Sequence, residues 1–395
     1  MDANGEHILS TAINNKKENL IDMLSYWEKT QLLDYDLIVV GGGITGIFCA
    51  LSYREKHPNA RIAILEKGLF SSGASTKNAG FACFGSLTEL MDDATKMDQD
   101  SMLKILELRV KGLALLRKTV GDKALDYKAY GGFELFFEEN PRALDFMSHY
   151  NALLRPIFNE DVYHLRSNRI KSFGFDTGKV NHLIENSFEA QINTGMMMRA
   201  LRTQLNEAHI FFFSHTEVTH FDADQKTVSV KSNEETIVFR YSKLAICNNA
   251  FAKQFFHDIE MNPGRGLVLA TAPIEGLKIK GTFHYDEGYY YFRNIGNRLI
   301  FGGGRNVDFK TETTTTFGVN ENIKAKLIHD LTSFILPNSA YTLDESWSGI
   351  MAFGKNKTPL VKKMGDHCAV GVRLGGMGIA IGSKIGRDTA ALLMD

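Results

Sequence analysis

Apolar residues near the start of the chain follow first a strand pattern and then a helix pattern. Asp36 to Val40 is a short β-branched run, which is typical of a buried parallel strand. Ile44 to Lys56 follows as a helix, and Ile62 to Leu65 is a second apolar run of strand length. This order of strand, helix and strand predicts a βαβ unit.

Glycines at fixed spacing join the first strand to the helix. Gly41, Gly43 and Gly46 form G-x-G-x-x-G, in which the glycines permit a tight turn, close approach to a pyrophosphate and close packing of helix on strand. The first amides of the helix would face the phosphates. Glu66 ends the second strand, where a carboxylate accepts ribose hydroxyls. The pattern predicts dinucleotide binding. The alternative is a glycine-rich turn in another α/β unit.

The rest of the chain alternates between helical and strand patterns. The stretch from Leu69 to Leu87 is too rich in glycine and serine for a regular element. Helices are predicted at 87–97, 101–120, 141–153, 196–207 and 321–334. Strands are predicted at 127–138, 210–213, 217–221, 228–230, 236–240 and 243–247, with more between 261 and 305. The tail from Cys368 to Met394 gives a strand, a glycine turn and a helix from Ile379.

The residues before the first strand can form an amphipathic helix from Lys16 to Leu33, with Trp27 on its apolar face. We expect this helix to pack on the outside of the domain. A lid or a partner contact is the alternative. Because the βαβ unit lies near the start of the chain and the last glycine turn near its end, we expect one cofactor domain built from separated segments.

Composition narrows the class of protein. The 395 residues are 44% hydrophobic with a net charge of −1, which argues against nucleic acid as the main partner. The four cysteines are far apart, so we expect reduced core thiols. The twelve histidines show no ligand spacing, so no metal site is predicted. Without a signal peptide or a transmembrane segment in the sequence, we expect a cytoplasmic protein.

Four further segments carry a family resemblance. They are GASTKNAGF at 73–81, HTEV at 215–218, KLAICNNAF at 243–251 and VGVRLGGMGIAIG at 370–382. In order and spacing, from Tyr35 to the C-terminus, the chain resembles the FAD-dependent oxidoreductases of the D-amino acid oxidase superfamily, which include glycine oxidase and monomeric sarcosine oxidase. The N-terminal 34 residues lie outside the match.

The resemblance implies noncovalent FAD and an α/β (α+β overall) fold, with a Rossmann-type FAD-binding domain and a second domain built on a mostly antiparallel sheet. The FAD-binding domain would comprise 35–128, 195–255 and 345–395, and the substrate domain 129–194 and 256–344, after an N-terminal helical extension at 1–34. The cofactor-binding residues are expected to be Gly41, Gly43, Ile44, Thr45, Gly46, Glu66, Lys67, Ala74, Ser75, Thr76, Asn78, Ala79, Gly80, Phe81, Val218, Asn248, Asn249, Gly375, Gly376, Met377, Gly378, Ile379 and Ala380.

On the substrate side, Tyr289 matches the pocket tyrosine of glycine oxidase, and strand alternation would point Tyr291 the same way. An aromatic sheet face is the alternative reading. The family's carboxylate-binding arginine is replaced by Met351, which makes no bidentate pair. Gly376 takes the place of the second arginine. Arg373 is the first candidate for the missing charge, followed by Arg265, Arg293 and Arg305, although for each of them a surface or supporting role is the alternative.

Two departures from sarcosine oxidase bear on the flavin. The cysteine that bonds flavin there corresponds here to Gly349 or Ile350, which agrees with noncovalent FAD. The lysine that promotes reaction with oxygen corresponds to Ile300. Lys77 is a possible substitute, with a solvent-facing or phosphate-facing role as the alternative. We therefore expect weak oxygen reactivity.

The sequence as a whole predicts an FAD-dependent oxidoreductase that moves a hydride from the C–H beside an amine to flavin N5. An amine or amino-acid-like molecule would be the substrate, and oxygen or another carrier the electron acceptor. The absence of the arginine pattern argues against a small free α-amino acid. Oxidation of a 2-hydroxy acid or polyol is an alternative enzyme activity. A non-catalytic flavin-binding module or a partner-dependent subunit is the alternative of another class.

Overall fold

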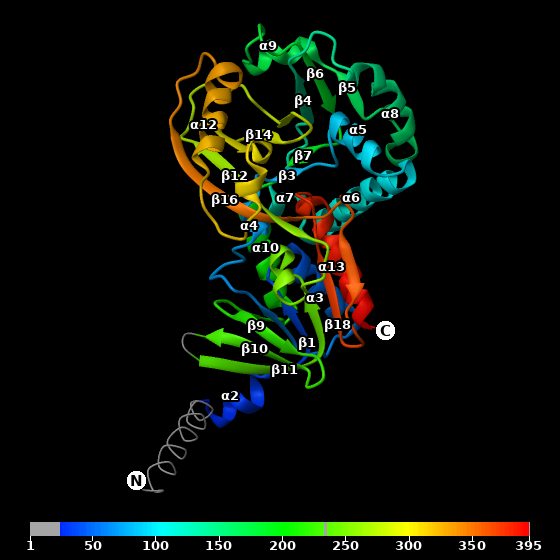
Figure 1. Cartoon of the computed structure of the whole chain (residues 1–395), viewed down its shortest axis with the longest axis vertical. Coiled ribbons are helices and arrows are strands. Elements are labelled where there is room, and N and C mark those ends of the chain that lie inside the picture. Colours follow the sequence, from blue (N-terminus) through cyan, green and yellow to red (C-terminus); the bar gives the residue numbers. More distant parts are fainter. Residues whose placement is uncertain (1–23, 233–234, 395) are drawn as a thin grey trace, which may run out of the picture.

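The computed structural model describes residues 24–232 and 235–394, and it builds them around two eight-stranded sheets. Each sheet forms the centre of one lobe of an elongated molecule (Figure 1). The first sheet has the order β17-β18-β11-β1-β2-β8, with β10 paired to β11 and β9 paired to β10. Its strands are β1 (Asp34–Val40), β2 (Ile62–Leu65), β8 (Phe211–Phe213), β9 (Glu217–Asp222), β10 (Thr227–Ser232), β11 (Glu235–Ile246), β17 (Leu360–Lys363) and β18 (Cys368–Val372).

The predicted βαβ unit is present, with β1 between β2 and β11 in parallel register. Val40 pairs with Leu65 on one side and Ile246 on the other, so the three strands end at one edge of the sheet. Strands buried on both faces are apolar throughout, which explains the β-branched run. One prediction was wrong: 236–240 and 243–247 are not separate strands, because β11 runs unbroken from the hairpin with β10 into the parallel sheet.

Helices α3 and α13 pack on this sheet and α6 packs on α13, and small residues let the three helices approach closely. Helix α3 (Ile44–Lys56) contacts α13 (Gly378–Met394), which in turn contacts α6 (Gln99–Val120). A Cβ added to Gly386 of α13 would lie 2.3 Å from the carbonyl oxygen of Thr45, and one added to Gly112 of α6 would lie 2.1 Å from that of Ala380. Helices from near the start and from the end of the chain therefore pack side by side.

The second sheet has the order β16-β12-β15-β14-β13-β4-β6-β5. Its core is aromatic: the rings of Phe283 and Phe292 stack at 4.9 Å, and Phe133 stacks on Phe283 at 5.1 Å. The strands are β4 (Gly132–Phe136), β5 (Tyr163–Leu165), β6 (His182–Asn186), β12 (Asn262–Thr271), β13 (Thr282–Tyr285), β14 (Tyr290–Ile295), β15 (Arg298–Gly303) and β16 (Leu343–Phe353). Most pairs are antiparallel, and β4 with β13 is the parallel exception.

The position of β16 corrects one predicted boundary. This strand pairs with β12 from Leu343 to Phe353, so it belongs to the second sheet. A domain limit between 344 and 345 would cut through the strand. The chain returns to the first sheet only after Phe353, through residues 354–359, to reach β17.

The remaining elements pack around the two sheets. The stretch after Leu69 is not wholly irregular, since α4 (Ala74–Lys77) is one helical turn and β3 (Phe81–Ala82) pairs with β7 (Ala190–Gln191). The other helices are α2 (Tyr26–Gln31), α5 (Leu87–Lys96), α7 (Asp122–Leu125), α8 (Ala143–Phe158), α9 (Ile170–Phe173), α10 (Thr194–Glu207), α11 (Phe309–Glu312) and α12 (Glu321–Asp330), with short turns η1 (Ser167–Arg169), η2 (Asn249–Gln254), η3 (Arg305–Val307) and η4 (Leu331–Ile335).

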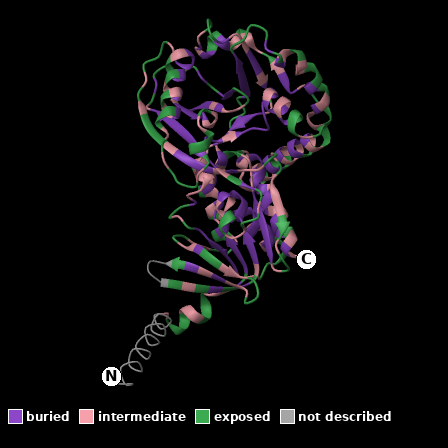
Figure 2. Cartoon of the chain, viewed as in Figure 1, coloured by how far each residue is buried: buried purple, intermediate pink, exposed green. Residues whose placement is uncertain are grey.

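The expected N-terminal helix is described only in part. Helix α2 buries none of its residues and leaves Trp27 70% exposed. The prediction that this helix packs on the domain through Trp27 was therefore wrong. The rest of the prediction, from Lys16 to Met23, lies outside the described residues. Figure 2 shows that burial instead follows the strands of both lobes. Across 24–232 and 235–394, no helix is both long and apolar enough to cross a membrane.

Candidate functional site

A single large cavity of about 990 Å³ is lined by residues from both lobes. This volume lies at the upper end of the range for small-molecule sites, as a site for a dinucleotide and a substrate requires. One end is formed by the carboxyl edge of the first sheet, and the other by β12, β14 and β16 of the second. Ligands of open parallel sheets bind at this edge, because strand ends and helix N-termini meet there.

The end at the first sheet is built from the glycine turn and the acid. Gly41 has φ +103°, and a Cβ there would lie 2.9 Å from the Asn248 backbone, so only glycine fits the turn. Gly43 is the N-cap of α3 and makes no side-chain cap. Glu66 is buried, and its carboxylate accepts hydrogen bonds from the amides of Gly42 at 2.8 Å and Gly68 at 3.0 Å. These bonds hold the acid beside the turn.

Residues from β9 and from the end of β11 close this part of the cavity. Val218 is buried at the cavity wall, and Lys67 beside it forms an ion pair with Glu217 at 2.7 Å. Asn249 has φ +49°, and its side-chain oxygen accepts the amide of Arg373 at 3.1 Å. The strand end at 248–249 is therefore tied to the C-terminal glycine turn.

The glycine- and serine-rich stretch forms the floor. Ser75 accepts the amide of Ile44 at 3.0 Å, which fixes α4 against the start of α3. Asn78 donates to the carbonyl oxygens of Ala74 and Ser75, at 3.0 and 2.9 Å. Its own side-chain oxygen accepts the amide of Gly80 at 2.9 Å. The loop is thus shaped by its own short polar side chains, and Ala79 and Phe81 at its end also line the cavity.

The C-terminal glycine turn lies opposite. Gly375 and Gly376 have φ +57° and +83°, and they lead into α13 at Gly378. The Gly375 amide donates to the carbonyl oxygen of Ala352 at 3.0 Å, so the turn is attached to β16. Met377, Ile379 and Ala380 line the cavity as well.

Three expected cofactor residues do not line the cavity but support it. A Cβ on Gly46 would lie 1.9 Å from the carbonyl oxygen of Gly41, so its role is the close packing of helix on strand. Thr76 donates its hydroxyl to the carbonyl oxygens of Ser71 and Gly73 within the loop. Gly80 has φ +78° and turns the chain beside Arg293. The remaining expected cofactor residues all line the cavity.

At the other end, strand alternation orders the three tyrosines as expected. Tyr289 and Tyr291 line the cavity, while Tyr290 points into the opposite core and stacks on Tyr285 at 4.7 Å. Burial raises the pKa of the Tyr291 phenol to about 12, so it stays protonated and can donate a hydrogen bond. The Met351 side chain lies over Gly266, close to this phenol.

The four candidate arginines have different partners. Arg265 forms a bidentate pair with Glu312 at 2.8 and 2.9 Å and does not line the cavity. Arg293 is buried and donates to backbone carbonyl oxygens, and burial lowers its pKa to about 10. Arg373 lines the cavity, but its guanidinium pairs with Glu260 at 2.7 Å. Its charge is therefore already matched, which contradicts its choice as the first substrate arginine.

Arg305 is the fourth arginine and lines the cavity at the start of η3. Its guanidinium lies 3.9 Å above the ring of Phe353 and 4.9 Å from that of Phe309. Among the residues described here, no carboxylate pairs with it. Burial lowers the pKa of Arg305, while Tyr289 and Glu312 act in the opposite direction. An unmatched guanidinium held on aromatic rings is suited to bind an anionic group.

The structure also reveals a buried polar cluster beside the cavity that the sequence did not indicate. Glu89 and His284 line the cavity, and Glu189 lies 3.4 Å from the imidazole of His284. Burial lowers the pKa of His284, but the facing carboxylates outweigh this effect and leave its pKa raised. The members come from α5, β13 and the residue before β7, so no local spacing could have found them.

One part of this cluster has ligand-type side chains close together. Ligand atoms of Cys83, Glu189 and His284 lie within 4.8 Å of one another. The contact between His284 and Glu189 accounts for two of them, and burial raises the pKa of the Cys83 thiol, which disfavours the thiolate that a metal needs. The absence of a metal centre stays a prediction.

The residues at the first end fit a dinucleotide. The hydroxyl of Thr45 and the side-chain oxygen of Asn248 are buried without a hydrogen-bond partner among the described residues, and both residues line the cavity. Gly73 and Gly375 have open space where a side chain would project. A dinucleotide needs polar partners for its pyrophosphate and open space for its flat rings. The unmatched polar atoms and the glycine-lined space beside a helix N-terminus provide both.

The fold and this site define a two-domain, dinucleotide-binding oxidoreductase. A family model described as "FAD dependent oxidoreductase" (DAO) matches residues 36–392. The chain therefore belongs to this family, as the resemblance implied, and is an FAD-dependent enzyme. None of the curated proteins compared with the chain matches it.

Solved structures share the fold at low sequence identity. Glycine oxidase from Geobacillus kaustophilus has a TM-score of 0.72 and 19% identity, over 92% of this chain and 95% of that chain. L-Proline dehydrogenase from P. horikoshii has a TM-score of 0.71 and 15% identity, over 91% of this chain and 93% of that chain. L-Amino acid deaminase from Proteus vulgaris has a TM-score of 0.71 and 13% identity, over 91% of this chain and 94% of that chain. These likenesses support the fold class.

Proposed function

We propose that the protein oxidises the C–N bond of an amine that also carries an anionic group, such as an N-substituted or bulky amino acid. The observation that carries this proposal is Arg305, whose guanidinium lines the cavity without a carboxylate partner in the described chain. FAD, when bound, supplies the acceptor for the hydride. The similar solved structures, among them a glycine oxidase, support an amino acid or amine as the substrate class.

A carboxylate in the lining of the same cavity favours an amine over an alcohol as the substrate. Glu89 lines the cavity and is nearly buried. Burial raises the pKa of Glu89, but Lys357 and His284 outweigh burial and leave it lowered, so the carboxylate is ionised. A cavity lined by both a guanidinium and a carboxylate suits a substrate with both charges, and a 2-hydroxy acid or a polyol has no cation for Glu89.

The roles of the other residues follow from their positions. Tyr289 and Tyr291 would donate hydrogen bonds to the substrate and exclude water from it. Met351 would contact its apolar part. Gly349 and Ile350 offer no thiol, which supports noncovalent FAD. Ile300 is buried in an apolar cluster with Val268 and Ala270, which supports slow reaction with oxygen and hence another electron acceptor.

An anaerobic reduction series tests the substrate class. Purified holoprotein is mixed with carboxylate-bearing amines, with the same amines as neutral amides, and with the matching 2-hydroxy acids. We expect loss of the flavin absorbance with the carboxylate-bearing amines and slower loss with the amides. Faster reduction by the hydroxy acids would contradict the proposal. No reduction by any compound would favour a flavin-binding module or a subunit that needs a partner.

A further inference from the structure

The segment from β16 to β17 crosses between the two lobes and passes over the cavity. We call residues 354–358 the strap. Gly354, Lys355, Asn356 and Lys357 all line the cavity, and they follow directly after Met351 and Phe353 of the substrate end. The strap is therefore part of the wall that a substrate would meet.

Both ends of the strap are attached to the first lobe. The amide of Lys355 donates to the carboxylate of Glu260 at 2.9 Å. Arg373 pairs with the same carboxylate at 2.7 Å and donates to the carbonyl oxygen of Thr358 at 3.0 Å. Arg373 thus has a clear task outside substrate binding, which is to anchor the strap.

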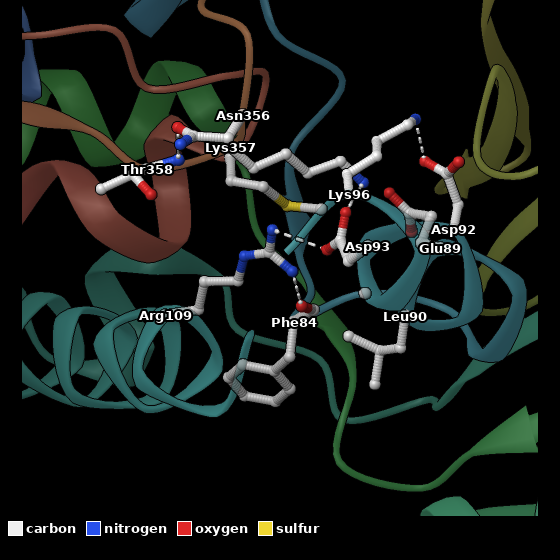
Figure 3. A network of polar contacts seen from close by, with 12 residues as sticks. Phe84, Glu89, Leu90, Asp92, Asp93, Lys96, Arg109, Asn356, Lys357 and Thr358 are labelled. Carbon is white, nitrogen blue, oxygen red and sulfur yellow. Dashed lines mark hydrogen bonds and ion pairs between the residues drawn. The ribbon is translucent and has the colours of Figure 1, made fainter. Parts of the chain in front are cut away.

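Between these anchors, Lys357 reaches across to helix α5. Its ammonium nitrogen lies 2.7 Å from Asp93, whose side chain is only 2% exposed. Figure 3 shows Lys357 extending from its segment toward Asp93 on α5. Asp93 also faces Arg109, with 3.8 Å between the charged groups, and Arg109 donates to the carbonyl oxygen of Phe84 at 2.6 Å. The strap and α5 are thereby joined through a buried carboxylate.

This ion pair connects two walls of one cavity. Helix α5 contributes Glu89 and Asp92 to the lining, and the strap faces them. Asp93 has a second cation in Arg109, which is fully buried between α5 and α6. Because Arg109 remains when Lys357 is removed, the carboxylate keeps a counter-charge and the strap loses its attachment to α5.

We propose that Lys357 is a positioning residue, which holds the strap against α5 as the wall of the substrate pocket and so sets which substrates fit. The inference rests on the proposed function only for the identity of the substrate. The strap forms one side of the pocket and α5 the other. Without the Lys357 contact the strap moves away from α5, and the pocket accepts longer substrates but orients the original one poorly.

The test compares Lys357→Met, Lys357→Arg and a matched control, Lys362→Met on the exposed strand β17. The first readout is hydrogen exchange of the holoprotein, which needs no substrate. We expect the peptide over 352–360 to exchange about tenfold faster in Lys357→Met, as local opening predicts, while α5 and the two other variants stay unchanged. Unchanged exchange in Lys357→Met would overturn the proposal, whether or not any amine reduces the flavin.

The second readout uses the best amine from the reduction series. We expect KM to rise about tenfold in Lys357→Met with kcat within about twofold, and Lys357→Arg to restore KM. A fall in FAD content and thermal stability, shared by Lys357→Met and Lys357→Arg, would instead indicate a purely structural contact and overturn the positioning role.

Discussion

The charge of Arg305 is the single-residue feature on which the proposed substrate most depends. Replacing Arg305 by Met keeps the apolar stem over Phe353 but removes the guanidinium. We expect KM for a carboxylate-bearing amine to rise about 10- to 100-fold, with a smaller effect for Arg305→Lys, because lysine lacks the bidentate fork. Steady-state kinetics of each variant with the amine and with its neutral amide measure the change in KM.

The control for that substitution lies at the start of β15, the strand that precedes η3. Arg298 begins β15 and pairs with Asp344 at the surface. Arg298→Met should leave KM unchanged. If Arg305→Met lowers the rate for the amide as much as for the carboxylate, Arg305 does not recognise the anionic group.

Glu134 gives a second prediction at this scale, on stability. Burial raises the pKa of Glu134 from 4.5 to about 7, against hydrogen bonds from Thr88 and Ser86. Between these pH values the unfolded chain releases a proton that the folded protein retains, so the contribution of Glu134 to stability falls as pH rises and is lowest above pH 7.

Replacing Glu134 by Gln removes this titration and keeps one oxygen that can accept from the Ser86 and Thr88 hydroxyls, whereas the amide NH2 cannot accept from the Thr88 backbone amide. Because that loss is the same at every pH, we expect the free energy of unfolding of Glu134→Gln, relative to the parent, to be about 2 kcal/mol higher at pH 8 than at pH 5. Denaturant titrations at the two pH values measure the difference. An equal difference at both values would show that Glu134 does not titrate in this range.

At the scale of elements, contact between α3 and α13 links the two ends of the chain. Both helices begin at the cavity. Gly386→Ala would place a methyl group 2.3 Å from the carbonyl oxygen of Thr45 and 2.8 Å from the amide of Cys49, so the helices must separate. We expect a loss of about 1–3 kcal/mol in stability together with weaker FAD binding. Denaturant unfolding and the FAD dissociation constant measure these effects.

A matched glycine separates packing from helix propensity. Gly195 lies in the first turn of α10, where an added Cβ has only one neighbour, at 3.5 Å. Gly195→Ala should be neutral or slightly stabilising, since alanine favours helix. If Gly386→Ala behaves in the same way, the close approach of α3 and α13 does not constrain the fold.

Element prediction from the sequence succeeded where the signal is local. The βαβ unit and the last helix follow from apolar runs bounded by glycine, since sterics confine those turns to residues without a Cβ. It was wrong where tertiary pairing decides the extent of an element. Strand β11 continues through the polar residues at 240–243 because β1 lies beside it from Asp34 onward.

For the whole molecule, the cavity is lined by segments from both ends of the chain, so we expect FAD to contact both. FAD bound only to the folded state should stabilise the apoprotein by about 2.7 kcal/mol at 100 times its dissociation constant. Thermal unfolding of the apoprotein with and without FAD measures this, and NAD at the same concentration is the control. An equal shift with NAD would argue against the specificity of the site for FAD.

The sequence by itself determined most of the residues that line the cavity at the first sheet. Gly41, Gly43 and Glu66 act through backbone geometry and short-range hydrogen bonds, which depend on neighbouring residues, and the expected residues line one cavity. Three of them, Gly46, Thr76 and Gly80, support the wall instead, because Gly46 allows helix to pack on strand, Gly80 turns the chain, and the Thr76 hydroxyl donates within its own loop.

Only the tertiary structure decided the substrate end. Arg305 and Arg373 have the same side chain and both follow a buried strand, yet Glu260 matches the charge of Arg373 and no described carboxylate matches that of Arg305. Lys357 meets Asp93 although more than 260 residues separate them in the sequence. Whether a charged side chain is available to a ligand depends on the partners that folding brings beside it. A local sequence pattern does not show those partners.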